Sequence, residues 1–260
     1  MVLPPPFKID LTEQFLHLSQ APIAEAVIDI RARAASGWEE AAIAKQLQEK
    51  LTDYPHSMSQ RGIQGQVKFD VTGPPEATTK DLGWMGIAMA SADRRNVAEY
   101  RLDGFTFHRL PPYESWELLL AEAMRLWKVY VELARPTEIQ RIGLRFINRL
   151  ELPLQEFRFE DYIQPAPQPP QGLAFPFAGF FHHDTLAVPD YPYAMNIIRT
   201  IQLPQNAGQG VAVILDIDVG TIEPMEWSEG IIASRLAEMR WLKNKAFFGS
   251  VTPNTLEKYT

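Results

Sequence analysis

The segment RIGLRFINRL, residues 141–150, shows most directly how this chain folds. Its side chains alternate in character, and successive side chains of an extended strand point to opposite faces. One face is apolar and consists of Ile142, Leu144, Phe146 and Leu150. The other face carries Arg141, Arg145 and Arg149. We therefore predict a strand over residues 138–152 with one buried face and one polar face.

The same alternation occurs before and after this segment. Residues 23–34 place small and branched apolar side chains on one face and mainly charged ones on the other. Residues 210–222 do the same, with Asp216 and Asp218 opposite a row of apolar residues. Asp103-Gly104 separates two further strands and is a strong hairpin signal. The remaining strands are expected at residues 65–72, 83–91, 97–102, 105–110, 178–188 and 193–203.

Three segments are predicted to be helices, because their apolar residues recur every three or four positions. They are residues 37–53, 113–134 and 229–248. Ser36, with Glu39 three residues later, fits a capping box at the start of the first helix. The second helix carries an aromatic stripe of Trp116, Trp127 and Tyr130. The Pro-rich residues 164–177 are expected to form a loop.

The order of these elements predicts an α+β fold, with an antiparallel sheet or sheets and helices packed on one face. It corresponds to two similar β-α-β(3-4)-α halves, residues 23–136 and 137–260, after an extended N-terminal arm of residues 1–22. The two halves can also form one continuous domain. Such an order is typical of the TATA-binding-protein-like and helix-grip-like folds, and a fold alone does not give a function.

Composition narrows the classes of function. The chain has 260 residues, no cysteine and a formal net charge of −7. Disulfides, thiolate zinc sites and cysteine nucleophiles are therefore excluded. We expect no membrane span, because no run reaches the ~18 apolar residues that a span needs. We expect a cytoplasmic location, because the first residues lack a signal-peptide pattern. The acidic balance disfavours nucleic acid without excluding it.

Four segments, kept in order over nearly the whole chain, carry a resemblance. They are APIAEAVIDIR (21–31), GFTFHRLPPYESW (104–116), RIGLRFINRL (141–150) and WLKNKAFFGSVTP (241–253). Together they resemble an uncharacterised bacterial family of about this length that is sporadically distributed across genomes. The resemblance implies no established activity and no catalytic residues. A sporadic distribution is typical of horizontally moved systems such as phage defence or toxin–antitoxin modules.

The charged faces of the strands form the candidate working surface. If the helices cover the apolar face, the other face carries arginines that can bind a carboxylate or phosphate ligand. The candidate ligand-binding residues are Arg31, Arg33, Arg101, Arg141, Arg145 and Arg149. The simpler interpretation is a solvated face with cross-strand ion pairs, each worth ~0.2–1 kcal/mol. Both interpretations stay open at this point.

Asp216 and Asp218 add a third interpretation, because two carboxylates on one strand face can share a divalent cation such as Mg²⁺. With the arginines holding phosphates, the face would then resemble that of triphosphate-tunnel enzymes. The Glu-x-Glu-x-Lys opening of those enzymes is missing, since residues 25–31 are EAVIDIR. No other cofactor is expected. The adjacent His182 and His183 point to opposite faces of a strand and do not chelate together.

The closing segment, residues 240–253, interleaves basic and aromatic side chains, a pattern that can indicate nucleic acid binding. Because its aromatic residues recur at helical spacing, we predict core packing instead. The predicted solvated basic edge consists of Arg240, Lys243 and Lys245.

No phosphate-binding loop, nucleophile elbow, zinc-protease or dinucleotide-binding motif occurs. We therefore expect no catalytic residues, and a non-catalytic binding or adaptor protein with a protein partner or a homo-oligomer. Such a chain fits a subunit of a mobile bacterial defence or toxin–antitoxin system. The alternative is a metal-dependent phosphohydrolase or a nucleotide-binding sensor that uses the charged face.

Overall fold

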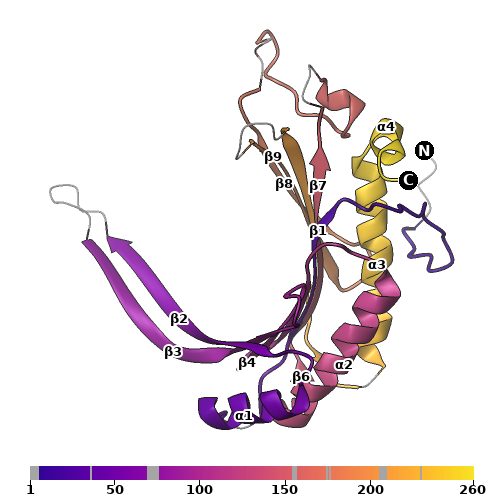
Figure 1. The fold of residues 1–260 in the computed structure, drawn as a ribbon. Helices are drawn as coiled ribbons and strands as arrows, with labels where there is room; N and C mark the ends of the chain where they lie inside the picture. Colours follow the sequence, from indigo (N-terminus) through magenta and orange to yellow (C-terminus); the bar gives the residue numbers. More distant parts are fainter. Residues whose placement is uncertain are drawn as a thin grey trace.

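The chain forms one nine-stranded antiparallel sheet, seen in the computed structural model as a strongly curved layer (Figure 1). The structure describes residues 6–35, 37–68, 76–153, 157–173, 175, 177–204, 210–228 and 230–260. The strand order is β2-β3-β4-β5-β1-β7-β10-β9-β8. The first strand of the chain therefore lies near the centre of the sheet, between β5 and β7.

In the centre of the sheet, the strands begin and end close to the residues that the alternation of apolar and polar side chains predicts. The sheet strands are β1 (Ile23–Arg31), β2 (His56–Lys68), β3 (Glu76–Ala90), β4 (Asn96–Arg101), β5 (Gly104–Arg109), β7 (Arg141–Glu151), β8 (Phe181–Ala187), β9 (Tyr193–Gln202) and β10 (Ala212–Thr221). Two short strands pair with each other, β6 (Glu138–Ile139) and β11 (Met225–Glu226). The helices are α1 (Glu40–Lys50), α2 (Trp116–Ala134), α3 (Ile231–Ser250) and α4 (Pro253–Glu257), with one 3₁₀ turn, η1 (Phe159–Asp161).

The three longer helices lie on the convex side of the sheet (Figure 1). Helix α3 contacts β7 and β10, α2 contacts β5, and α1 contacts β3. The concave side is left open by the helices that the structure describes (Figure 1). The expectation of an α+β chain with a large antiparallel sheet and helices on one face is confirmed.

The core lies between the convex face of the sheet and these helices. Ile142, Leu144 and Phe146 are at most 1% exposed, as their alternation with arginine predicts. From α2, Trp127 stacks on Tyr130 at a centroid distance of 5.1 Å and meets Phe105 of β5 at 6.0 Å. Burial of one such apolar side chain stabilises the fold by ~1.5–3 kcal/mol, so this layer supplies most of the stabilisation.

Strands β2 and β3 extend beyond the rest of the sheet as a long curved hairpin (Figure 1). The sequence predicts strands only at residues 65–72 and 83–91, whereas β2 begins at His56 and β3 at Glu76. Residues 69–72 lie outside the described part of the chain. The strand over residues 56–64 was missed because most of these side chains are exposed, so burial imposes no alternation on the sequence.

The first strand is shorter than predicted. The alternation suggests a strand over residues 23–34, but β1 ends at Arg31. Beyond it, the Ala32 N–H donates to the Asp103 carbonyl at 3.1 Å, so the chain leaves the sheet at the β4–β5 turn. Arg33 therefore lies beyond the end of β1 and is exposed.

Helix α1 is also shorter than the predicted residues 37–53. Glu39 is the N-cap residue and makes no capping hydrogen bond with its side chain, and Ser36 lies outside the described residues. Helix α4 was not predicted. Thr252 caps it by accepting a hydrogen bond from the Thr255 N–H at 3.3 Å.

Residues 6–22 contain no helix or strand and run along α3. Phe15 stacks on Phe248 at 5.5 Å, and a Glu13 carboxylate oxygen accepts a hydrogen bond from Trp241 Nε1 at 2.8 Å. Within the described ranges, no helix has the length and apolar character needed to cross a lipid bilayer.

Candidate binding surface on the concave face

The pairing register aligns side chains from all nine strands on the concave face. In antiparallel strands, directly opposite residues share one face of the sheet. One complete row consists of Met58, Ala88, Glu99, Thr106, Asp29, Gly143, Gly220, Ala194 and Ala187. The charges that the sequence places on separate strands therefore lie side by side.

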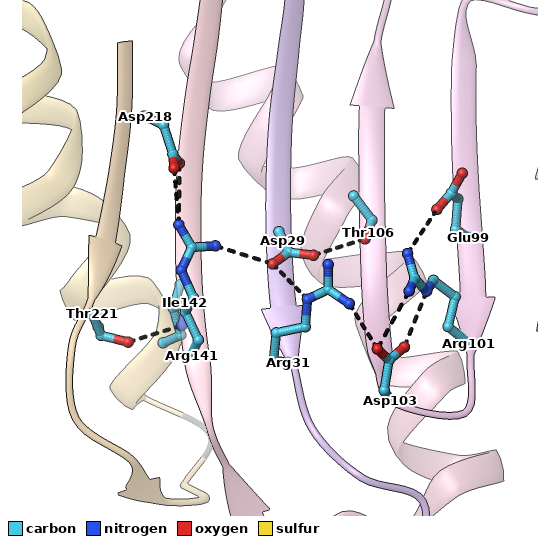
Figure 2. A network of polar contacts seen from close by, with 10 residues as sticks. All are labelled: Asp29, Arg31, Glu99, Arg101, Asp103, Thr106, Arg141, Ile142, Asp218 and Thr221. Carbon is cyan, nitrogen blue, oxygen red and sulfur yellow. Dashed lines mark hydrogen bonds and ion pairs between the residues drawn. The ribbon is translucent and has the colours of Figure 1, made fainter. Parts of the chain in front are cut away.

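Arg141 lies across two glycines of this row. A Cβ atom added to Gly143 or Gly220 would stand 2.5 Å from its guanidinium nitrogens, so only glycine leaves room for this side chain. Nη1 of Arg141 donates to Asp29 at 3.2 Å, and Nη2 donates to Asp218 at 3.0 Å (Figure 2). The guanidinium thus bridges β1 and β10 across β7.

The pairing continues from Asp29 toward the edge of β4 (Figure 2). Asp29 also accepts from Arg31 Nε at 3.1 Å, and Arg31 Nη1 donates to Asp103 at 2.9 Å. Arg101 donates to the other oxygen of Asp103 at 3.0 Å and lies 3.9 Å from Glu99. We call this set the ion-pair chain: Asp218, Arg141, Asp29, Arg31, Asp103, Arg101 and Glu99.

Arg145 and Asp216 form a separate two-pronged pair beside the chain. Nε donates to one carboxylate oxygen at 2.8 Å and Nη2 to the other at 2.5 Å. The hydrogen bonds from Arg145 to Asp216 raise the pKa of the guanidinium further above its ordinary value. The Asp216 side chain is 10% exposed and that of Arg145 47%, so the carboxylate lies beneath the arginine.

Arg149 makes different contacts from the other two arginines of β7. It donates to Gln202 at 3.0 Å and pairs with Glu151 on its own strand. Of the six arginines that the sequence suggests, five lie on the concave face and bind a carboxylate there: Arg31, Arg101, Arg141, Arg145 and Arg149. Arg33 is the exception, because β1 has ended before it.

These pairings decide what the face can do chemically. An arginine fork that already holds a carboxylate presents fewer free N–H groups to a phosphate. Asp218 and Asp216 each face a guanidinium, so binding a cation between them requires breaking both ion pairs. In the part of the chain that the structure describes, no group of three or more histidine, cysteine or acidic residues is arranged to hold a metal ion. The geometry matches the interpretation as a face with cross-strand ion pairs.

The structure adds contacts on this face that the sequence did not predict. Asp103 reads as a turn residue in the sequence, yet it joins Arg31 to Arg101. His108 Nδ1 lies 2.7 Å from Glu25, and its Nε2 is buried and has no hydrogen-bond partner among the described residues. Alternation places Glu25 and His108 on polar faces, but their pairing depends on the register between β1 and β5.

The β2–β3 hairpin borders the concave face and exposes apolar side chains. Met58 is 65% exposed, and Ile63, five residues along β2 and therefore on the other face, is 72% exposed. Leu82, an extra residue of β3 at a bulge, is 49% exposed. Met58 belongs to the row that crosses the sheet. At the opposite edge, Phe181 of β8 is 65% exposed. The polar floor of the concave face therefore has apolar side chains at both margins.

No family model, curated protein or solved structure matches this chain. What the concave face can bind is therefore inferred from its side chains and their contacts alone.

Proposed function

We propose that the chain is a non-catalytic binding protein that holds a protein partner on the concave face and the β2–β3 hairpin. The observation that carries this proposal is the hairpin itself. A two-stranded hairpin is marginally stable in water at best, unless its side chains pack against something else. The outer part of this hairpin exposes Ile63 and Leu82, and Met58 is exposed where β3 still pairs with β4. A partner would remove these side chains from water.

The charge pattern of the floor favours a protein over a polyanion. The ion-pair chain contains four carboxylates and three guanidiniums, so the arginines do not make the face basic. The whole chain carries a formal charge of −7. Nucleic acids bind to clustered cations whose charge is free to displace counterions. A neutral or basic polypeptide surface suits this floor better.

The sheet order supports a further part of the proposal, namely two similar halves in a TATA-binding-protein-like arrangement. β1 and β7 begin the halves and pair with each other, and β5 and β10 flank them and precede the long helices α2 and α3. The halves are not equal, since β2 has no counterpart beyond β8 among the described strands. The likeness concerns the fold alone, because the arginines that the structure describes on the floor are already paired with carboxylates.

The resemblance to a sporadically distributed bacterial family suggests where to look for the partner. We propose that it is encoded beside the gene for this chain, in a mobile defence or toxin–antitoxin system. The test is co-expression of the tagged protein with its neighbouring genes, followed by affinity purification and mass spectrometry. The partner identified in this way is then purified and titrated with defined variants.

The double variant Met58→Asp with Ile63→Asp places charge on the hairpin, where both side chains are already exposed. We expect it to weaken partner binding at least about tenfold, because charge within an apolar contact costs ~1.4 kcal/mol or more. Leu118→Asp is the matched control, since Leu118 is 58% exposed on α2, which lies on the other side of the sheet.

Equal binding by the double variant and the wild type would overturn the hairpin as the docking surface. The absence of any partner, together with stabilisation by nucleotides in a thermal-shift screen, would overturn the proposal in favour of a nucleotide-binding sensor or phosphohydrolase on the charged face.

A further inference from the structure

A cavity of about 400 Å³ lies on the convex side of the molecule, away from the concave face. Three parts of the chain surround it: the N-terminal arm, the segment that begins α2, and α3. Its aromatic lining includes Phe15, Tyr113, Trp116, Trp241, Phe247 and Phe248. The volume suits a small molecule with an apolar body.

Lys243 of α3 lines this cavity. Its Nζ lies 4.2 Å from the centre of the Phe146 ring, and no carboxylate lies within ion-pairing distance among the described residues. The sequence predicts Lys243 on a solvated basic edge, and the structure corrects this, because the side chain is partly buried between helix and sheet.

The carboxylates that line the cavity are already engaged elsewhere. Glu13 of the arm binds Trp241 at 2.8 Å and Lys245 at 2.9 Å. The other two carboxylates also have cationic partners: Glu114 binds Arg109 at 2.6 Å, and Glu117 lies 3.5 Å from Arg240. None of them neutralises Lys243.

The missing counter-ion has an electrostatic consequence. Burial, with the nearby charge of Arg240, lowers the pKa of the Lys243 amine from 10.5 to about 7. Part of the lysine population is therefore protonated at neutral pH, beside the aromatic side chains that line the cavity. An anion placed beside the amine would favour the charged form and raise its pKa again.

We propose that this cavity binds a small amphipathic carboxylate, with its acidic group at Lys243 and its apolar body against Phe15, Trp116 and Phe248. Arg240 lines the same cavity and supplies a second cation near the acidic group. Asn244, one residue beyond Lys243, adds an amide donor at the lining. Polar groups and an aromatic wall thus line the same cavity, and an amphipathic ligand can use both.

The probe for this proposal is 3-phenylpropionate, with the neutral amide 3-phenylpropionamide as its matched control. Isothermal titration calorimetry at pH 6.5 compares the two ligands on the wild type, Lys243→Met and Lys128→Met. Lys128 is an exposed lysine of α2 that does not line the cavity. We expect the wild type to bind the acid at least about tenfold more tightly than the amide, a difference of ~1.4 kcal/mol.

The preference for the acid over the amide should fall below about threefold in Lys243→Met, because this variant lacks the principal cation. The same preference should stay unchanged in Lys128→Met. Equal affinity of the wild type for acid and amide, or no binding of the acid, would overturn the proposal. A preference that survives in Lys243→Met would also overturn it, because the anion would then bind elsewhere.

A second readout uses the wild type alone and does not depend on a folded variant. Above pH 7, binding of the carboxylate should be accompanied by proton uptake, measured by titration in buffers of different ionisation enthalpy. The other titratable or charged groups around the cavity are Glu13 and His17 of the arm, Tyr113, Glu114 and Glu117 before and in α2, and Arg240 of α3. His17→Gln should retain the uptake. Binding without proton uptake at pH 8 would contradict the role of Lys243.

Discussion

The two faces of strand β7 differ in what their side chains contact, although they alternate along one segment. On the convex face, Leu144 is fully buried among apolar side chains of the core. On the concave face, the next residue, Arg145, is half-exposed and binds Asp216. The first environment excludes water, whereas the second stays in contact with it. We infer that the convex face carries the stability of the fold and that the concave face is available for binding.

The largest expected difference between the faces comes from truncating one residue on each. Leu144→Ala should destabilise the protein by ~2–5 kcal/mol, because it leaves a cavity in a close-packed core. Arg145→Ala should cost less, ~1–2 kcal/mol, because the half-exposed guanidinium covers the Asp216 carboxylate and its removal opens that carboxylate to water. Urea unfolding with linear extrapolation measures both values. Similar costs for the two variants would contradict the contrast between the faces.

Lys243 also tests the contrast between the two faces, because it is a basic residue on the convex side, where most side chains are apolar and buried. Its pKa in the folded protein, about 7, lies below the ordinary 10.5, so the folded state binds fewer protons than the unfolded state between these values. The full cost of charging the buried amine is therefore present below about pH 7, and stability recovers as the pH rises toward 10.5.

Lys243→Met should accordingly stabilise the protein by about 2 kcal/mol at pH 6, and this gain should largely disappear by about pH 10. Thermal and urea unfolding at both pH values provide the measurement. Lys128→Met, at an exposed position, is expected to show no such pH-dependent difference. A gain in Lys243→Met that is equal at both pH values would show that packing, and not charge, is responsible.

A smaller effect is expected from the centre of the ion-pair chain. Arg141→Met should destabilise the protein by ~1–2 kcal/mol, because it leaves Asp29 and Asp218 without their shared guanidinium. The exposed pair of Arg61 and Asp81 provides the control, and Arg61→Met should cost clearly less than Arg141→Met, because water screens an exposed pair. If both variants cost the same, the bridge across the two glycines adds nothing to stability.

The smallest expected effect concerns metal binding on the concave face. Because Asp216 and Asp218 each hold an arginine, 5 mM MgCl₂ should shift the melting temperature by less than about 1 °C relative to NaCl of equal ionic strength. A larger rise that Asp216→Asn or Asp218→Asn abolishes would favour the metal-dependent alternative. In that case the ion pairs would have to open to admit the cation.

Most of the fold could be predicted because buried positions recur at a regular spacing, and apolar residues occupy them in the sequence. The alternation in β7 and β10 and the Asp103-Gly104 turn predicted the corresponding elements to within a few residues. The prediction failed at residues 56–64, where the side chains are mostly exposed on both sides of the hairpin. Alternation cannot reveal a strand whose faces have the same environment.

The candidate site was predictable only in part, and for a similar reason. The sequence placed Arg141, Arg145 and Arg149 on a polar face and suggested cross-strand ion pairs there, but it did not show which carboxylate each arginine binds. It also assigned Lys243 to a solvated edge, because helical spacing alone does not show that the N-terminal arm closes over that part of α3.

The sequence by itself determined which side of each central strand is apolar, because strand geometry fixes that pattern within a few residues. Only the tertiary structure decided which charges meet. Arg141 reaches Asp29 across 112 positions of the chain and Arg31 reaches Asp103 across 72. Such partners depend on the register between strands and on glycines that leave space at two positions. Local sequence carries no record of that register, so pairing appears only when the whole sheet is assembled.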